Sequence, residues 1–267
     1  MTISLYSFGG GQMVEAIIRA SLKNKAIQKE STFVTDISEQ RVKDLKARYG
    51  INAETSVNDF LDDAEIVLLG VRPQDDWREV IKTVARRNPK AQVISIIAGV
   101  TIAQLQKAAG VNLAVTRIIP NTLTDTGFGY SGAALSKKAD KATVDPFLTS
   151  FGKVDYIPED QIDIYTGYGV AGPNYVYNFF IALTNAGVLG GLSRKQANAV
   201  ALENLQGAAK MLEITGKHPY ELLDINNSAG GVGIAAQHEL DASDFAGGIQ
   251  NAVLAAIRRT TALGKGN

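Results

Sequence analysis

The start of the chain constrains its fold most strongly. An apolar run over Ile3–Phe8 leads straight into the glycines of Gly9-Gly10-Gly11, and a helix-forming run begins at Met13. A second short apolar run follows and ends on Asp36. Glycine has no Cβ, so a phosphate can approach the backbone of such a turn and bind the free N–H groups at the start of the helix. We therefore predict a strand–turn–helix unit that receives the pyrophosphate of a nicotinamide dinucleotide.

This motif departs from the usual pattern at one position. Gly9 and Gly11 supply the first two glycines, but the third position, which favours a small residue for close helix packing, is Val14. A glycine-rich turn that binds no ligand is the alternative interpretation. Asp36 favours the dinucleotide, because it lies at about the expected distance downstream to accept hydrogen bonds from ribose hydroxyls.

Composition excludes several classes of function. The 27 basic and 27 acidic residues balance, so no charged face indicates nucleic acid or anionic lipid. Cysteine is absent and the only histidines are His218 and His238, which excludes a thiolate or histidine-rich metal site and leaves only carboxylate sites open; we predict no metal. No run is long and apolar enough for a membrane span, and no signal peptide is evident. We therefore expect a soluble, cytoplasmic protein.

The first part of the chain alternates strand-like and helix-like segments. Continuous apolar runs such as Ile66–Leu69 are typical of strands buried on both faces of a parallel sheet. The expected strands are Ile3–Phe8, Thr32–Thr35, Ile66–Gly70, Val93–Ile97, Ala114–Ile118, Tyr130–Leu135 and Val154–Tyr156. The expected helices are Met13–Asn24, Ser38–Tyr49, Ser56–Asp63, Gln74–Arg87 and Thr101–Ala109. This alternation predicts an α/β fold, with a Rossmann-type doubly wound domain over residues 1–157.

From Pro158 the strand-like runs disappear, which predicts an all-α second domain over residues 158–267. Its expected helices are Asp160–Leu189, Ser193–Thr215, Pro219–Asn226, Val232–Glu239 and Ser243–Ala262. The segment Tyr175–Leu189 is almost entirely apolar, so every side of it requires burial. We predict that this domain is a subunit interface. The alternative is that the segment packs against the chain's own first domain.

Ligands of open parallel sheets bind beyond the carboxyl ends of the strands, so the residues that follow each strand are considered together. Small residues recur there, and Arg72 is the one strong charge, either facing a phosphate or lying in solvent. The residues expected to bind the cofactor are Phe8, Gly9, Gly11, Gln12, Met13, Asp36, Asn58, Val71, Arg72, Pro73, Ala98, Gly99 and Asn121.

Seven short motifs, spread in order over nearly the whole chain, resemble those of one enzyme family. They are Val71-Arg72-Pro73-Gln74, Ser95-Ile96-Ile97-Ala98-Gly99-Val100-Thr101-Ile102, Arg117-x-x-Pro120-Asn121-Thr122, Gly172-Pro173-x-Tyr175-Val176, Gly187-x-Leu189-Gly190-Gly191-Leu192, Thr215-Gly216-Lys217-His218-Pro219 and Ser228-x-Gly230-Gly231. Together they resemble pyrroline-5-carboxylate reductase. The resemblance implies hydride transfer from a nicotinamide cofactor to the C=N carbon of a cyclic imino acid, giving proline. It also implies a homodimer with interleaved helical domains, and possible larger rings of dimers.

The residues add their own support for imine reduction. Between Lys153 and Lys195 there is no lysine and no histidine to protonate a carbonyl oxygen. A cyclic imine nitrogen is basic enough to be protonated on binding, so it needs positioning more than a general acid. We expect the substrate carboxylate to bind the glycine-rich loop Asn227–Ile234, which precedes a helix. The alternative is that this loop is only a turn between helices. We assign no catalytic side chain, and the residues expected in the substrate loop are Ser228, Gly230, Gly231, Val232 and Gly233.

That loop departs from the family pattern. The family's usual run is Ser-Pro-Gly-Gly-(Thr or Ala)-Thr, whereas this chain has Ala229 at the proline position and Val232 and Gly233 at the last two. Three interpretations follow: a proline-forming enzyme with weaker substrate contacts, a paralogue that reduces another cyclic imine, or a dinucleotide-binding protein without turnover.

Cofactor choice depends on the residues after the second strand. Asp36-Ile37-Ser38 stands where NADPH-using members of the family often have a basic run. A carboxylate repels a 2′-phosphate and accepts a hydrogen bond from a 2′-hydroxyl, and Ile37 adds no compensating charge. We predict that NADH is preferred and that NADPH use is possible.

Overall fold

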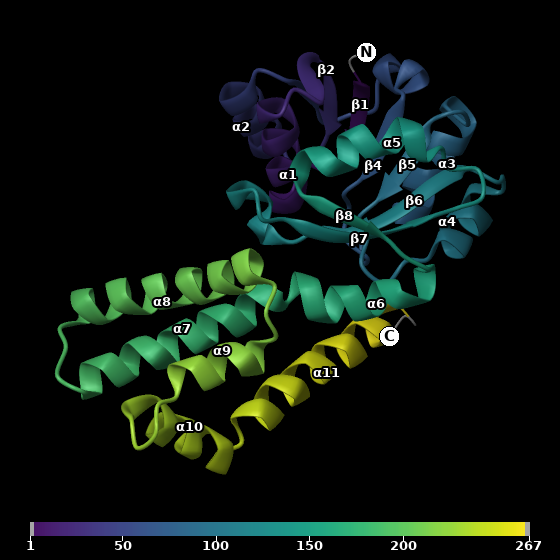
Figure 1. Ribbon diagram of the computed structural model, residues 1–267. Helices are drawn as coiled ribbons and strands as arrows, with labels where there is room; N and C mark the ends of the chain where they lie inside the picture. Colours follow the sequence, from purple (N-terminus) through teal and green to yellow (C-terminus); the bar gives the residue numbers. More distant parts are fainter. Residues whose placement is uncertain (1–2, 265–267) are drawn as a thin grey trace. The chain divides into compact units, whose positions relative to one another are not determined.

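The computed structural model describes residues 3–264 and separates them into two compact units (Figure 1). The sheet unit contains the described residues up to Ala171 together with those from Ala255 onward. The helical unit contains Gly172–Leu254. The domain boundary expected between residues 157 and 158 stays a prediction, and residues 158–171 group here with the sheet unit.

Eight strands of the described chain form one sheet in the order β3-β2-β1-β4-β5-β6-β7-β8. All neighbours are parallel except β6 and β7, which are antiparallel. The strands are β1 (Ile3–Phe8), β2 (Ile27–Thr35), β3 (Asn52–Glu54), β4 (Ile66–Leu69), β5 (Gln92–Ser95), β6 (Ala114–Ile119), β7 (Tyr130–Leu135) and β8 (Lys153–Tyr156). The first six strands have the order of a doubly wound dinucleotide-binding sheet, which confirms the predicted fold class.

Helices cover both faces of this sheet (Figure 1). They are α1 (Gln12–Lys23), α2 (Glu39–Tyr49), α3 (Trp77–Arg87), α4 (Ile102–Ala109), α5 (Lys141–Leu148) and α6 (Ile162–Tyr165). Successive side chains of a strand point to opposite faces, so Leu5 belongs to the core cluster that includes residues of α1, α2 and α5, while Tyr6 belongs to the cluster that includes residues of α3 and α4. Both side chains are fully buried, as are the four residues of β4.

The strand register brings the expected cofactor residues to one edge. Phe8, the last residue of β1, pairs with Thr35 on one side and Leu69 on the other. Leu69 pairs with Ser95, which in turn pairs with Arg117. The residues that follow β1, β2, β4, β5 and β6 therefore meet at the carboxyl edge of the parallel strands.

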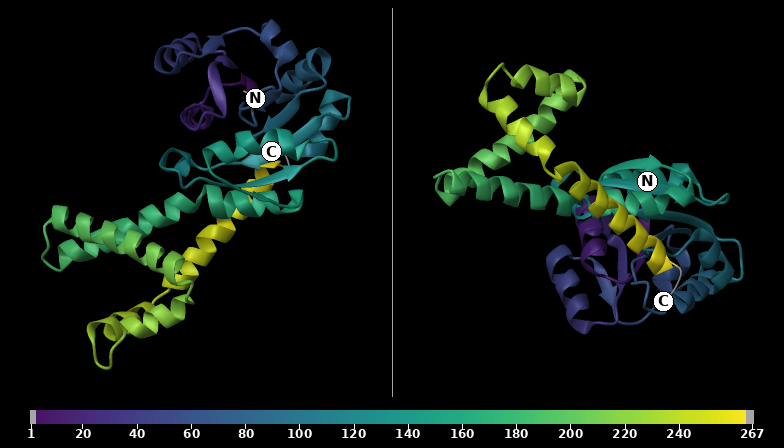
Figure 2. Two further views of the ribbon diagram at one scale, coloured as in Figure 1. Left: turned by 45° about the horizontal axis from the view of Figure 1, so that its top comes forward. Right: turned by 90° about the horizontal axis from the view of Figure 1, so that it is seen from below.

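The helical unit exposes much of its apolar surface. Its helices are α7 (Gly172–Leu189), α8 (Arg194–Thr215), α9 (Pro219–Asn226), α10 (Val232–Ala242) and the first half of α11 (Phe245–Gly264). Helices α7 and α8 pack side by side (Figures 1 and 2). Buried side chains are few here and include Thr184, Ala197 and Ala201, whereas Tyr177 and Ile181 on α7 are each 55% exposed. No helix among the described residues is long and apolar enough to cross a lipid bilayer.

Several expected elements differ in the structure. Strand β3 and helix α5 were not predicted, because a three-residue edge strand has no periodic pattern and Pro146 interrupts the helical one. Ser56–Asp63, expected as an α-helix, contains only the short 3₁₀ helix η1 (Asp59–Asp63), which the Asn58 side chain caps.

The helix expected over Asp160–Leu189 is also interrupted. The 3₁₀ helix η4 (Glu159–Gln161), α6 and the π-helix η5 (Thr166–Val170) precede α7. Gly167 in η5 packs so closely on Ile257 of α11 that a Cβ on this glycine would lie 2.5 Å from the Ile257 backbone nitrogen. Glycines are weak helix formers, so the winding of this segment follows packing rather than propensity.

Candidate functional site

The glycine turn between β1 and α1 is shaped by close backbone packing. Gly9 has a φ of +90°, and its amide donates a hydrogen bond of 2.7 Å to the Thr35 carbonyl. A Cβ on Gly9 would lie 2.8 Å from the carbonyl oxygen of Gly70, at the end of β4. Glycine is therefore required at position 9 by both conformation and space.

The start of α1 is open to a ligand. Gly11 is the N-cap residue and supplies no side-chain hydrogen bond to the first turn. A Cβ on Gly11 would meet no atom within 4 Å, and Gln12 beside it is exposed. The amides at a helix start have no helical acceptor, and they carry the positive end of the helix dipole. This geometry fits the phosphates of a dinucleotide.

The missing third glycine of the motif is compensated across the turn. A Cβ on Gly70 would lie only 2.1 Å from Cγ2 of Val14. The buried Val14 side chain thus occupies the volume that a side chain at position 70 would need. Helix α1 can therefore pack closely on the sheet because the small residue is Gly70, directly after β4, rather than position 14.

Asp36, directly after β2, contacts the same turn. Its Oδ2 accepts a hydrogen bond of 2.8 Å from the Gly10 amide, and its Oδ1 accepts one of 2.9 Å from the Ser38 amide. Carboxylate oxygens have further lone pairs, so both can still accept hydroxyl donors. The neighbouring Ile37 side chain is 93% exposed and offers no charge to a phosphate.

Other expected cofactor residues are occupied by local hydrogen bonds. Arg72, in the loop after β4 with Val71 and Pro73, pairs with Asp75 at 2.8 Å, and its side chain is 68% exposed. Asn58 lies after β3, where its Oδ1 accepts from the Phe60 amide at 3.2 Å. Their contacts with a cofactor stay predictions.

The remaining expected residues follow β5 and β6. Gly99 has a φ of +75° in the turn after β5, beside the half-buried Ala98. Asn121 is buried, and its Oδ1 accepts from the Leu123 amide at 3.1 Å while its Nδ2 donates to the Gly169 carbonyl at 3.1 Å. Asn121 therefore joins the end of β6 to η5.

A charged network beneath the glycine turn was missed by sequence reasoning. Glu15 of α1 is 3% exposed and accepts hydrogen bonds from Arg41 and, at 2.7 Å and 3.1 Å, from Tyr49 and Arg48. Burial alone would raise the pKa of Glu15, but the hydrogen bonds from Tyr49, Arg41 and Arg48 outweigh it and lower the pKa to about 2. The only feature of the sequence that could have pointed to this network is that Glu15 lies in the first turn of the expected helix.

A second buried charge joins β6 to the segment after β8. The Arg117 side chain is 3% exposed and pairs with Asp163 at 3.1 Å and with Glu159 at 3.5 Å. Glu159 also accepts a hydrogen bond of 2.7 Å from the Ile102 amide at the start of α4. Arg117 belonged to a family motif, but its ion-pair partners were not predicted.

The substrate loop lies in the helical unit, before α10. Gly230 has a φ of +66°, and the Gly231 amide donates to the Ser228 carbonyl at 3.0 Å. Gly231 is the N-cap of α10 without a side-chain cap, and Ser228 and Val232 are exposed. The start of this helix is thus formed by glycine backbone, and its role as an anion-binding loop stays a prediction.

Gly233 is shaped by the residues before the loop. A Cβ at this position would lie 2.5 Å from Oδ1 of Asn227 and 2.8 Å from the Asn226 carbonyl oxygen. The Asn226 carbonyl and the Asn227 carboxamide thus leave no room for a side chain at position 233 in this conformation.

The histidines have local roles. His218 is exposed and caps α9 by accepting from the Tyr220 amide at 3.3 Å through Nδ1. His238 is exposed on α10. No group of three His, Asp or Glu side chains that could hold a metal ion occurs within residues 3–264.

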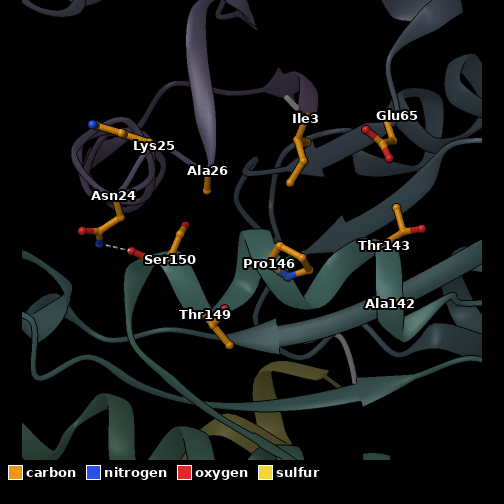
Figure 3. Close-up of a pocket in the computed structure, with 10 residues that line it drawn as sticks. All are labelled: Ile3, Asn24, Lys25, Ala26, Glu65, Ala142, Thr143, Pro146, Thr149 and Ser150. Atoms are coloured by element: carbon orange, nitrogen blue, oxygen red, sulfur yellow. Dashed lines mark hydrogen bonds between the residues drawn. The ribbon is translucent and has the colours of Figure 1, made fainter. Parts of the chain in front are cut away.

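A cavity of about 670 Å³ lies at the opposite edge of the sheet unit (Figure 3). It is lined by residues at the amino ends of β1, β2 and β4, among them Ile3, Ala26 and Glu65. Asn24 donates a hydrogen bond of 2.6 Å to the Ser150 carbonyl at its rim. Because dinucleotides bind at the carboxyl edge, this cavity is separate from the candidate cofactor site.

Two family models match the chain. Residues 159–263 match pyrroline-5-carboxylate reductase dimerisation, and residues 7–99 match NADP oxidoreductase coenzyme F420-dependent. The pyrroline-5-carboxylate reductase of Corynebacterium melassecola is 33% identical over 263 residues, which cover 96% of this chain and 97% of that protein. The chain belongs to the pyrroline-5-carboxylate reductase family.

Further members of the family agree over the whole length. The pyrroline-5-carboxylate reductase of Synechocystis is 33% identical over 99% of this chain and 100% of that protein. The crystal structure of Plasmodium falciparum pyrroline carboxylate reductase with NADP bound is 27% identical, has a TM-score of 0.88 and covers 98% of each chain. The resemblance stated from the sequence is therefore confirmed, together with the fold class.

Proposed function

We propose that this protein reduces 1-pyrroline-5-carboxylate to proline with a reduced nicotinamide dinucleotide. The imine is protonated on its ring nitrogen, and its C=N carbon would gain the hydride that the reduced dinucleotide supplies. Similarity to reductases of this name over nearly the whole chain is the observation that carries the proposal.

The chain's own residues bind and orient. The cofactor, when bound, supplies the hydride. The uncapped amides from Gly11 to Met13 would bind its phosphates, and the Asp36 carboxylate, which accepts from the Gly10 amide, would also accept hydrogen bonds from a ribose hydroxyl. The glycine backbone at the start of α10 holds the substrate carboxylate. Positioning and backbone electrostatics thus account for the reaction without a side-chain acid.

A substrate screen tests this proposal. Purified protein is mixed with NADH or NADPH and a panel of cyclic imines, and the absorbance of the reduced nicotinamide is followed. Oxidation with 1-pyrroline-5-carboxylate faster than with the other imines supports proline formation. Faster oxidation with another ring indicates a paralogue, and cofactor binding without oxidation across the panel indicates a non-catalytic protein.

NADH is the preferred cofactor in this proposal. The Asp36 carboxylate would repel a 2′-phosphate, and the exposed Ile37 gives it no cationic partner. The double variant Asp36→Ser with Ile37→Arg should raise kcat/KM for NADPH relative to NADH. Ile37→Gln is the matched control, since it adds polarity without charge. An unchanged preference in the double variant would contradict this placement of the ribose.

The protein acts as a homodimer in this proposal, with larger rings of dimers as a further assembly. The helical unit has few buried side chains and half-exposed apolar side chains on α7. Burial of such surface requires a partner, and the family model matched to this region describes dimerisation. Light scattering should give at least twice the mass of the chain, and a monomer at micromolar concentration would refute the interface.

A further inference from the structure

The two peptide groups of the glycine turn are held from several directions. In the Gly9–Gly10 peptide, the carbonyl accepts a hydrogen bond of 2.9 Å from the Ser7 hydroxyl, and the amide donates to Asp36. In the Gly10–Gly11 peptide, the carbonyl accepts from Nε of Arg41. These two peptides contain two carbonyls and two N–H groups. Of these four groups, only the Gly11 N–H has no protein partner among the hydrogen bonds of the described residues.

The Arg41 contact sets the direction of that free amide. The peptides of the described chain are trans, and a trans peptide directs its N–H opposite to its carbonyl. A Gly10 carbonyl anchored on Arg41 therefore turns the Gly11 N–H away from α2. A Cβ on Gly11 would also meet no atom within 4 Å, so the residue that carries this amide is itself not crowded by side chains.

Arg41 is itself held in place. Its backbone amide donates to the Ser38 hydroxyl at 3.3 Å in the first turn of α2, and its Nη2 donates to the buried Glu15 carboxylate. The Arg41 side chain is 16% exposed. The guanidinium fork can bind two acceptors in fixed directions, which a lysine ammonium cannot reproduce.

We propose that Arg41, anchored by Glu15, is a positioning residue that aims the Gly11 amide at a phosphate of the dinucleotide. This inference rests on the proposed function, because it specifies how the turn binds the cofactor. Arg41 acts through the peptide and needs no contact with the ligand. Its effect falls on cofactor affinity rather than on hydride transfer.

Arg48 offers a matched control. It binds the same Glu15 carboxylate at 3.1 Å and carries the same charge, but its side chain is 61% exposed, and no hydrogen bond of the described residues links it to the turn. If Arg41 acted only as an ion-pair partner of Glu15, loss of either arginine would affect cofactor binding equally.

The experiment measures NADH dissociation constants by fluorescence titration without imine, and then kcat and KM with imine present. Arg41→Ala should raise the Kd and KM for NADH about tenfold, because the misdirected Gly11 amide loses its hydrogen bond to a charged phosphate. The kcat at saturating NADH should stay within about twofold of the wild-type value. Arg48→Ala should leave all three within about twofold. Arg41→Lys keeps the charge beside Glu15, so it should fold, and it should still raise the Kd about fivefold.

The outcomes separate this inference from the proposed function. Wild-type binding of NADH with an unchanged Kd in Arg41→Lys overturns the positioning role, as does an equal effect of Arg41→Ala and Arg48→Ala. A fall in kcat with unchanged KM also overturns it. A wild-type protein that binds neither NADH nor NADPH refutes the proposed function, and the inference with it.

Discussion

Replacement of Glu15 by glutamine should remove a specific part of the protein's acid sensitivity. The hydrogen bonds to this buried carboxylate lower its pKa from the ordinary value of 4.5 to about 2. A group with a lowered folded-state pKa stabilises the fold above its unfolded pKa, and this contribution is lost as the pH falls toward the folded value. The difference between these two pKa values corresponds to a contribution of about 3 kcal/mol to the free energy of unfolding, and about 2 kcal/mol of this contribution is lost between pH 5 and pH 3.

The assay is urea unfolding of wild type and Glu15→Gln at pH 5 and pH 3, at equal protein concentration because association adds to stability. Glutamine has nearly the same shape and retains an acceptor oxygen for Arg41, so the variant should fold. Between these pH values the wild type should lose about 2 kcal/mol more of its free energy of unfolding than the variant. Other carboxylates titrate in both proteins and cancel in the comparison.

A glutamate outside the network provides the control. The Glu39 side chain is 81% exposed on α2, so Glu39→Gln should follow the wild type at both pH values. Equal pH dependence of wild type and Glu15→Gln would refute the conclusion that Arg41, Arg48 and Tyr49 hold Glu15 ionised in the folded state.

Two further substitutions test the backbone geometry of the two loops. Gly9→Ala should lower the free energy of unfolding, measured in urea, by at least about 2 kcal/mol, because residue 9 has a positive φ and its Cβ would meet the Gly70 carbonyl. Gly11→Ala is the control and should keep the stability of the wild type. Equal stability of the two variants would contradict this reasoning. Gly233→Thr, which introduces the family's usual residue, should lower kcat/KM for the imine because Asn227 occupies the space, whereas the exposed position of Val232→Thr should tolerate the change. Higher activity of Gly233→Thr would show that Asn227 moves aside readily.

The sheet and the glycine turn could be predicted from sequence because their signals are local. Strands such as β4 are continuous apolar runs, and the glycines occur where a strand meets a helix. Expected strand bounds agree with the structure to within a residue or two, except in β2, which begins at Ile27 rather than Thr32. The polar residues Gln28–Ser31 hid the start of that strand.

The hydrogen-bond partners could not be predicted in this way. Glu15 and Arg41 are separated by 26 positions, and Arg117 and Asp163 by 46. Nothing in a single sequence pairs one buried acid with one of several arginines. Arg72, expected to face either a phosphate or solvent, has a side chain that is 68% exposed, and its pairing with Asp75 three residues on was not predicted.

The packing of Val14 against Gly70 changes how a glycine fingerprint should be defined. In this chain a larger side chain on α1 is combined with a glycine directly after β4, so the helix stays close to the sheet although the third position of the motif is not small. A linear search string that demands a small third residue would pass over chains of this type. A search that scores both positions jointly would retain them.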